Sequence, residues 1–188
     1  MEVATKNITY ADLRDLEIPE GDTGIYELIK GQIVRRASPN TPHQRVSFKL
    51  AIEFGIYNRQ KNLGQFFAAP YDVYLDEENA GIQPDLLFVS HERDFVIREN
   101  NGVVGAPDLI VEILSKGTMN KDRGDKMEVY EQFAVREYWI VDPQNQSIEV
   151  YRMENNRYRL FSFAAEEGTI KSSVLPDFEL DVKTVFEN

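Results

Sequence analysis

The segment Leu109-Ile110-Val111-Glu112-Ile113-Leu114 carries the clearest fold signal in the sequence. It is apolar throughout except for Glu112, which is typical of a strand covered on both faces. Strand-like runs precede and follow it at 65–69, 73–75, 86–89 and 138–141, and a helical pattern covers about 121–134. This succession predicts an α/β (α+β) fold in which a mixed sheet is joined by helical crossovers.

The flanking segments complete one predicted domain over residues 1–188. Before the central strands we expect a helix at 9–16, a hairpin of strands 25–29 and 32–37, and a long helix at 41–60 capped by Thr41. After them, the runs 147–152, 157–163 and 169–174 predict a C-terminal β-meander. No internal repeat or linker divides the chain.

Composition and charge exclude several classes of protein. The chain has 188 residues and no cysteine, which excludes a disulfide-rich secreted scaffold. No stretch reaches the roughly 18 apolar residues of a membrane span, and we expect a cytoplasmic protein. Lys and Arg number 21 against 32 Asp and Glu, giving a net charge of −11. Since this charge repels nucleic acid at long range, a DNA-facing site would have to be locally basic.

Two carboxylates interrupt the apolar strands. Glu112 lies in the middle of its strand, where a buried carboxylate must be paired, metal-bound or neutral. Asp85 opens another strand, and if the two strands are neighbours, both carboxylates meet at one place. Hard cations such as magnesium bind such oxygen pairs. The alternatives are a structural ion pair or a water-exposed strand edge for Glu112, and a turn position for Asp85.

A lysine lies on the apolar stripe of the helix expected at 121–134. Lys126, Val129, Tyr130 and Phe133 are spaced i, i+3, i+4 and i+7, so the lysine faces the sheet. The alternative is that its stem lies along the core edge and its ammonium reaches water. A local surplus of basic residues could steer a phosphate there, with Lys116, Lys121, Arg123 and Lys126 against Asp122 and Asp125.

Two further residues are weaker candidates, and a third is excluded. Glu27, in the predicted hairpin, faces either the working side of the sheet or solvent. His43, near a helix N-terminus, could contact phosphate, although a surface histidine is the more common case. Asp108 is excluded as a partner of Glu112, because four residues along a strand separate them by about 13 Å.

Taken in order, these motifs resemble the Uma-type family, which is classed among restriction endonucleases of the P-D-(D/E)-x-K nuclease superfamily. The resemblance runs from about residue 9 to residue 180. It rests on the segments Tyr26-Glu27-Leu28-Ile29-Lys30-Gly31, Pro84-Asp85, Val111-Glu112-Ile113-Leu114-Ser115, Asp122-Arg123-Gly124-Asp125-Lys126 and Glu137-Tyr138-Trp139-Ile140-Val141-Asp142.

The resemblance implies a restriction-endonuclease-like core with a metal site at the open edge of the sheet. Asp85 and Glu112 would hold Mg²⁺ or Mn²⁺, Glu27 would complete the site, and the substrate would be DNA. The superfamily pattern has a lysine two residues after Glu112, where this chain has Leu114. Either Lys126 has taken over the role of that lysine, which its sheet-facing position favours, or catalysis is impaired.

Two other function classes remain open. A catalytically silent binding or regulatory module is favoured by the negative charge and by Leu114, and a metal-dependent hydrolase could act on another substrate. A nuclease domain with one site must act twice to cut both strands of a duplex. Because a two-fold dimer brings two sites to the two antiparallel strands, the nuclease hypothesis also predicts a homodimer.

Overall fold

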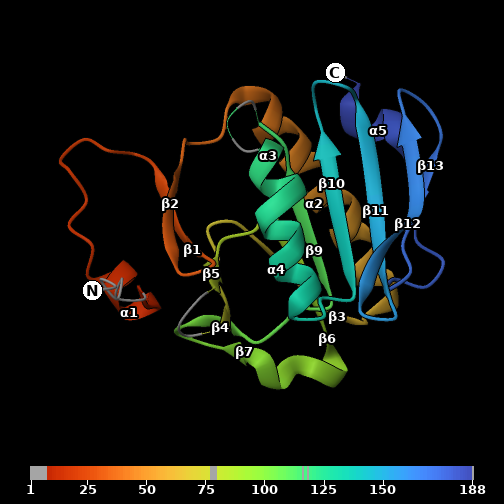
Figure 1. Ribbon diagram of the computed structural model, residues 1–188. Coiled ribbons are helices and arrows are strands. Elements are labelled where there is room, and N and C mark those ends of the chain that lie inside the picture. The colour runs from red at the N-terminus through yellow and green to blue at the C-terminus, as the bar shows by residue number, and fades with distance from the viewer. Residues whose placement is uncertain (1–7, 77–79, 116, 118, 188) are drawn as a thin grey trace.

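The computed structural model describes residues 8–76, 80–115, 117 and 119–187. A mixed sheet forms its centre, in which the strands Leu109–Ile113 (β9) and Glu137–Asp142 (β10) run parallel and the other neighbouring strands are antiparallel (Figure 1). The order is β12 (Arg157–Ala165), β11 (Ser147–Glu154), β10 (Glu137–Asp142), β9 (Leu109–Ile113), β6 (Leu86–Ser90) and β3 (Gly64–Ala68). The long apolar segments of the sequence thus form the middle strands.

A second sheet, built from strands between residues 25 and 104, lies beside the first. Its order is β2 (Gln32–Arg36), β1 (Ile25–Ile29), β5 (Ala80–Ile82), β4 (Val73–Asp76), β8 (Gly102–Val104) and β7 (Ile97–Arg98). Its apolar side chains share one core cluster with the odd-numbered positions of β6, such as Leu87 and Val89. The second sheet therefore covers part of one face of the central sheet.

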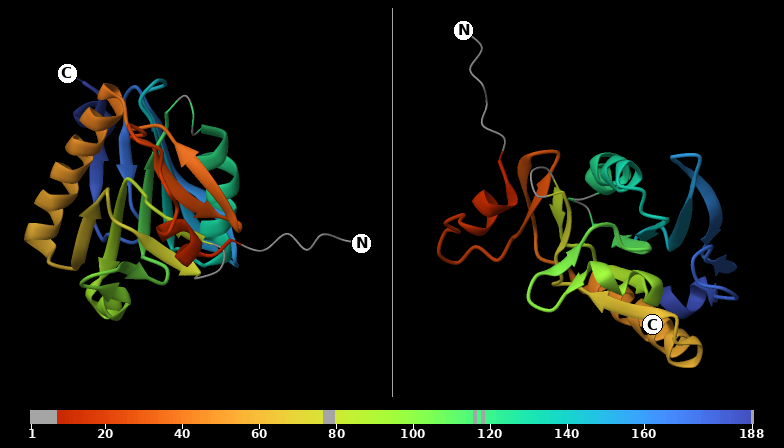
Figure 2. Two further views of the ribbon diagram at one scale, coloured as in Figure 1. Left: turned by 90° about the vertical axis from the view of Figure 1, so that its left-hand side faces the viewer. Right: turned by 90° about the horizontal axis from the view of Figure 1, so that it is seen from below.

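Helices cover both faces of the central sheet (Figure 2). On one face, α2 (Thr41–Lys61) buries Val46, Leu50 and Phe54 against a cluster that includes Trp139. On the other, α4 (Met127–Gln132) buries Val129 and Tyr130. The remaining helical segments are α1 (Tyr10–Arg14), a 3₁₀ segment (His91–Val96), α3 (Met119–Lys121), a π-helical turn (Asp122–Lys126) and α5 (Val182–Phe186). No helix among the described residues is long and apolar enough to cross a membrane.

The predicted fold class is confirmed, with differences in detail. The run at 169–174 does not add a third meander strand, because β13 (Thr169–Lys171) pairs with β14 (Glu179–Asp181) in a small separate sheet. The short strands β5, β7 and β8 were not predicted, since two or three residues carry too little periodicity. The cap of α2 is Asn40, whose side chain accepts a hydrogen bond from the His43 backbone, and not Thr41. A π-helical turn interrupts the helix expected at 121–134.

Two phenylalanines on α2 test the core assignment. Phe54 is 1% exposed and stacks on Phe66 and Phe178, whereas Phe48 is 68% exposed. Phe54→Ala is expected to lower the free energy of unfolding by about 3–5 kcal/mol, because it leaves a cavity in the core. Phe48→Ala should change it by less than about 0.5 kcal/mol. Urea unfolding of both variants measures the difference, and equal effects would contradict the assignment.

Candidate active site

The ends of β6 and β9 bring Asp85 and Glu112 together. In this antiparallel pair Leu86 is opposite Val111, so the next pair along is Asp85 and Glu112. Residues that are directly opposite each other point to the same face of a sheet, here the face covered by α4. One guanidinium nitrogen, Arg36 Nη1, lies 3.6 Å from Asp85 Oδ1 and 3.9 Å from Glu112 Oε2. The two carboxylates are therefore close neighbours, as the two interrupted strands predicted.

Lys126 points into this cluster from the last residue of the π-helical turn. Its Nζ lies 3.0 Å from Glu27 Oε1, 2.9 Å from Glu112 Oε1 and 3.7 Å from Asp122 Oδ1. The residue is 1% exposed, so the alternative in which its ammonium reaches water is wrong. One turn later, the Tyr130 hydroxyl donates a 2.7 Å hydrogen bond to Glu112 Oε1.

The β1–β2 hairpin supplies Glu27 and Arg36. Lys30 and Gly31 both have positive φ, as the tight turn between these strands requires. Glu27 is buried and accepts a 3.0 Å hydrogen bond from the Gln83 backbone, so its solvent-facing alternative is wrong. Arg36 Nη2 donates to the Gln83 carbonyl. The hairpin thus covers the carboxylates, which lie at strand ends inside the molecule and not at an open edge of the sheet.

His43 contacts Asp85 from the first turn of α2. Its Nε2 is 3.0 Å from Asp85 Oδ2, and the Ile113 backbone N–H donates to the same oxygen at 2.7 Å. His43 is 4% exposed, so the expected surface position is wrong. Burial raises the pKa of Asp85, but His43 and Arg36 outweigh this effect and the pKa lies below its usual value. Asp85 is therefore ionised at neutral pH.

The cluster holds more carboxylates than cations. Glu27, Asp85, Glu112 and Asp122 face the permanent cations Arg36 and Lys126. Burial, with the nearby Asp122 and Asp85 charges, raises the pKa of Glu112 to about 8 even though Lys126 lowers it. Burial lowers the pKa of Lys126, but Glu112 and Glu27 outweigh this and raise it, so the lysine stays charged. Glu112 is therefore mostly protonated at neutral pH in the metal-free protein, and the cluster can accept another cation in place of that proton.

Comparison with known proteins assigns the chain to a family. Residues 10–183 match the model of the Uma2 family, described as "Putative restriction endonuclease". The chain belongs to the Uma2 family. It is also 26% identical over 175 residues to an uncharacterized protein of Synechocystis sp. (strain ATCC 27184 / PCC 6803 / Kazusa), covering 91% of this chain and 96% of the relative. The resemblance inferred from the motifs is confirmed.

A solved structure has the same fold. It is a protein of Anabaena variabilis ATCC 29413, described as "a putative nuclease belonging to DUF820", with a TM-score of 0.74 and 19% sequence identity. The match covers 95% of this chain and 97% of that chain. This Uma2 chain thus shares its fold with that protein over nearly the full length of both chains.

Sequence reasoning missed part of the cluster in this Uma2 protein. Arg36 and Asp122 were not proposed as site residues, although Asp122 lies four residues before Lys126 on the same helical segment. Tyr130 was recognised only as part of the apolar stripe. No local sequence pattern indicated that Arg36 belongs to the site, because its partners Asp85 and Glu112 lie far away in the sequence. Lys116, counted in the basic surplus, falls outside the described residues.

The carboxylates are chemically suited to a hard divalent cation. Within the described part of the chain, no three His, Cys, Asp or Glu side chains are arranged to share one metal ion. Mg²⁺, however, keeps several waters and is usually bound by only one or two carboxylates. Asp85 and Glu112, whose oxygens approach the same guanidinium nitrogen, meet that requirement.

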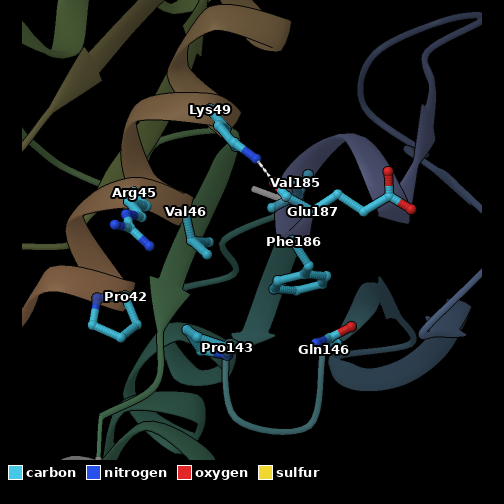
Figure 3. A pocket seen from close by; sticks show the side chains of 9 residues that line it. All are labelled: Pro42, Arg45, Val46, Lys49, Pro143, Gln146, Val185, Phe186 and Glu187. Atoms are coloured by element: carbon cyan, nitrogen blue, oxygen red, sulfur yellow. Dashed lines mark hydrogen bonds between the residues drawn. The ribbon is translucent and has the colours of Figure 1, made fainter.

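A surface cavity elsewhere on the molecule is lined by other residues. It has a volume of about 530 Å³ and lies between α2 and α5, with Arg45 and Lys49 on its wall (Figure 3). Lys49 Nζ donates to the Glu187 carbonyl across it. None of Glu27, Asp85, Glu112 and Lys126 lines this cavity. We therefore place the candidate site of this Uma2 protein in the buried cluster and not in the cavity.

Proposed function

We propose that the protein is a metal-dependent endonuclease that hydrolyses DNA phosphodiester bonds. The observation that supports this most strongly is the position of Lys126, whose ammonium touches Glu112 while Glu112 lies opposite Asp85. Two carboxylates and a lysine at one point are the groups that phosphodiester hydrolysis of this type needs. Family membership makes DNA the substrate class to test first.

Each residue has a separate task in this proposal. Asp85 and Glu112 would hold Mg²⁺ or Mn²⁺, which when bound polarises a phosphate and lowers the pKa of a water molecule. Lys126 would orient the attacking water and stabilise negative charge that develops on the phosphate. Glu27 accepts a hydrogen bond from Lys126 and would hold the ammonium in this position.

Lys126 would also explain the departure from the superfamily pattern at Leu114. Leu114 is 4% exposed and belongs to the apolar cluster between the sheet and α4. A lysine is therefore not needed in that position, because Lys126 brings its ammonium to Glu112 from the neighbouring helical segment. The role of the lysine is supplied from a different place in the sequence.

The most economical test is nicking of supercoiled plasmid DNA. The protein is expected to convert the plasmid to open-circular or linear form with MnCl₂ or MgCl₂, and to be inactive with EDTA. No conversion by folded protein at millimolar metal would contradict the proposal and favour the catalytically silent module. The burial of the cluster is the observation that favours that second candidate.

Oligomeric state is a separate prediction of the nuclease proposal. A homodimer would allow one complex to cut both strands, so light scattering should give about twice the 21.7 kDa mass of the chain. A 21.7 kDa species that makes single-strand nicks only would remove the reason for expecting a dimer.

A further inference from the structure

Arg36 lies between the carboxylates that we propose as metal ligands. Its Nη1 is within 4 Å of both Asp85 Oδ1 and Glu112 Oε2, and its Nε is 3.6 Å from Glu27 Oε2. Within the described part of the chain, it is the cation that forms ion pairs with both proposed ligands. The guanidinium therefore stands where the two carboxylates converge.

The contacts of Arg36 with these carboxylates are long. The distances of 3.6 Å from Arg36 Nη1 to Asp85 Oδ1 and 3.9 Å to Glu112 Oε2 allow electrostatic attraction, but both are longer than a hydrogen bond. A guanidinium frequently binds a carboxylate by two parallel hydrogen bonds at about 2.7–2.9 Å. Here Nη2 donates to the Gln83 carbonyl, and the buried Nε has no hydrogen-bond partner among the described residues. Arg36 thus supplies positive charge without the geometry of a permanent ion pair.

From this arrangement we propose that Arg36 competes with the metal ion for Asp85 and Glu112. It holds positive charge beside these two carboxyl groups in the metal-free protein and gives up this position when a divalent cation binds them. The physical reason is that two cations beside the same oxygens repel each other, and burial leaves this repulsion weakly screened. The inference rests on the proposed function, because it requires that the carboxylates bind metal.

Metal affinity without DNA tests the inference directly. Isothermal titration calorimetry with MnCl₂ would compare the full-length wild-type chain with Arg36→Gln, Arg36→Lys and Arg35→Gln. Arg36→Gln removes the competing charge and is expected to bind Mn²⁺ about tenfold more tightly, which is one unit in log Kd. Arg36→Lys retains the charge and should bind close to the wild-type affinity.

Arg35→Gln is the matched control on the same strand. Arg35 is half-exposed and pairs with Asp22, away from the cluster. The substitution removes the same charge one residue earlier, so it should leave the Mn²⁺ affinity unchanged. An equal gain in Arg35→Gln and Arg36→Gln would reveal a general charge effect and overturn the inference.

Loss of one partner from a buried ion pair is destabilising, so Arg36→Gln could be too unstable for calorimetry. In that case the dependence of the melting temperature on MnCl₂ concentration is the second readout. The melting temperature should then rise more steeply with MnCl₂ for Arg36→Gln than for wild type. If wild type binds Mn²⁺ and Arg36→Gln binds no more tightly, by either readout, the inference fails and the nuclease proposal stands. If neither protein binds Mn²⁺ at millimolar concentration, both fail.

Discussion

Lys126→Met is expected to lower kcat for plasmid nicking by a factor on the order of 10²–10³. The substitution keeps the length of the side chain and removes the ammonium that lies 2.9 Å from Glu112 and 3.0 Å from Glu27. Because lysine is not proposed as a metal ligand, Mn²⁺ binding should persist while turnover is lost. Nicking rates at saturating MnCl₂ measure this effect.

Stability has to be measured for the same variant. Removing one partner of a buried ion pair costs about 3–5 kcal/mol, so kcat should be compared at a temperature where circular dichroism shows Lys126→Met to be folded. Lys121→Met is the control, since it is the same substitution at a half-buried position one residue before the π-helical turn. A folded Lys126→Met with the wild-type rate would show that the lysine is structural.

Asp85→Asn is expected to weaken Mn²⁺ binding by about 100-fold or more and to abolish nicking. The amide removes one negative charge from the proposed pair of ligands. Its carbonyl oxygen can still accept the hydrogen bond that Asp85 receives from the Ile113 backbone, so the local fold should be retained. Calorimetry with MnCl₂ gives the affinity, and the plasmid assay gives the activity.

Asp108→Asn is the matched control for Asp85→Asn. Asp108 is also a buried carboxylate before a strand, but it accepts hydrogen bonds from the Ser90 backbone at 2.8 Å and from Arg136 at 2.9 Å. Its substitution should lower stability and leave Mn²⁺ affinity unchanged. If Asp85→Asn binds Mn²⁺ as tightly as Asp108→Asn does, Asp85 is not a ligand.

The sequence predicted those parts of the site that depend on local periodicity. A charged residue inside an apolar strand or helix stripe must face a covered surface, and this logic located Glu112, Asp85 and Lys126. It also predicted the mixed central sheet, because its middle strands are long and apolar. The direction in which these side chains point follows from the two-residue and 3.6-residue periods alone.

The remaining features depend on contacts between distant segments. Arg36 joins the cluster because the hairpin packs over the ends of β6 and β9, and no local pattern encodes that packing. His43 is buried because Asp85, 42 residues later, accepts its hydrogen bond. The helical stripe placed Lys126 correctly on the side that faces the sheet, but it could not show that the ammonium is buried between Glu27 and Glu112, where it is important for stability.

Anomalous diffraction from crystals grown with MnCl₂ tests the central claim most directly. The proposal requires one manganese peak in contact with the carboxylates of both Asp85 and Glu112, and the loss of that peak in Asp85→Asn. A peak bound only elsewhere, or no peak at a concentration where calorimetry shows saturation, would contradict the assignment of this cluster as the metal site of a nuclease.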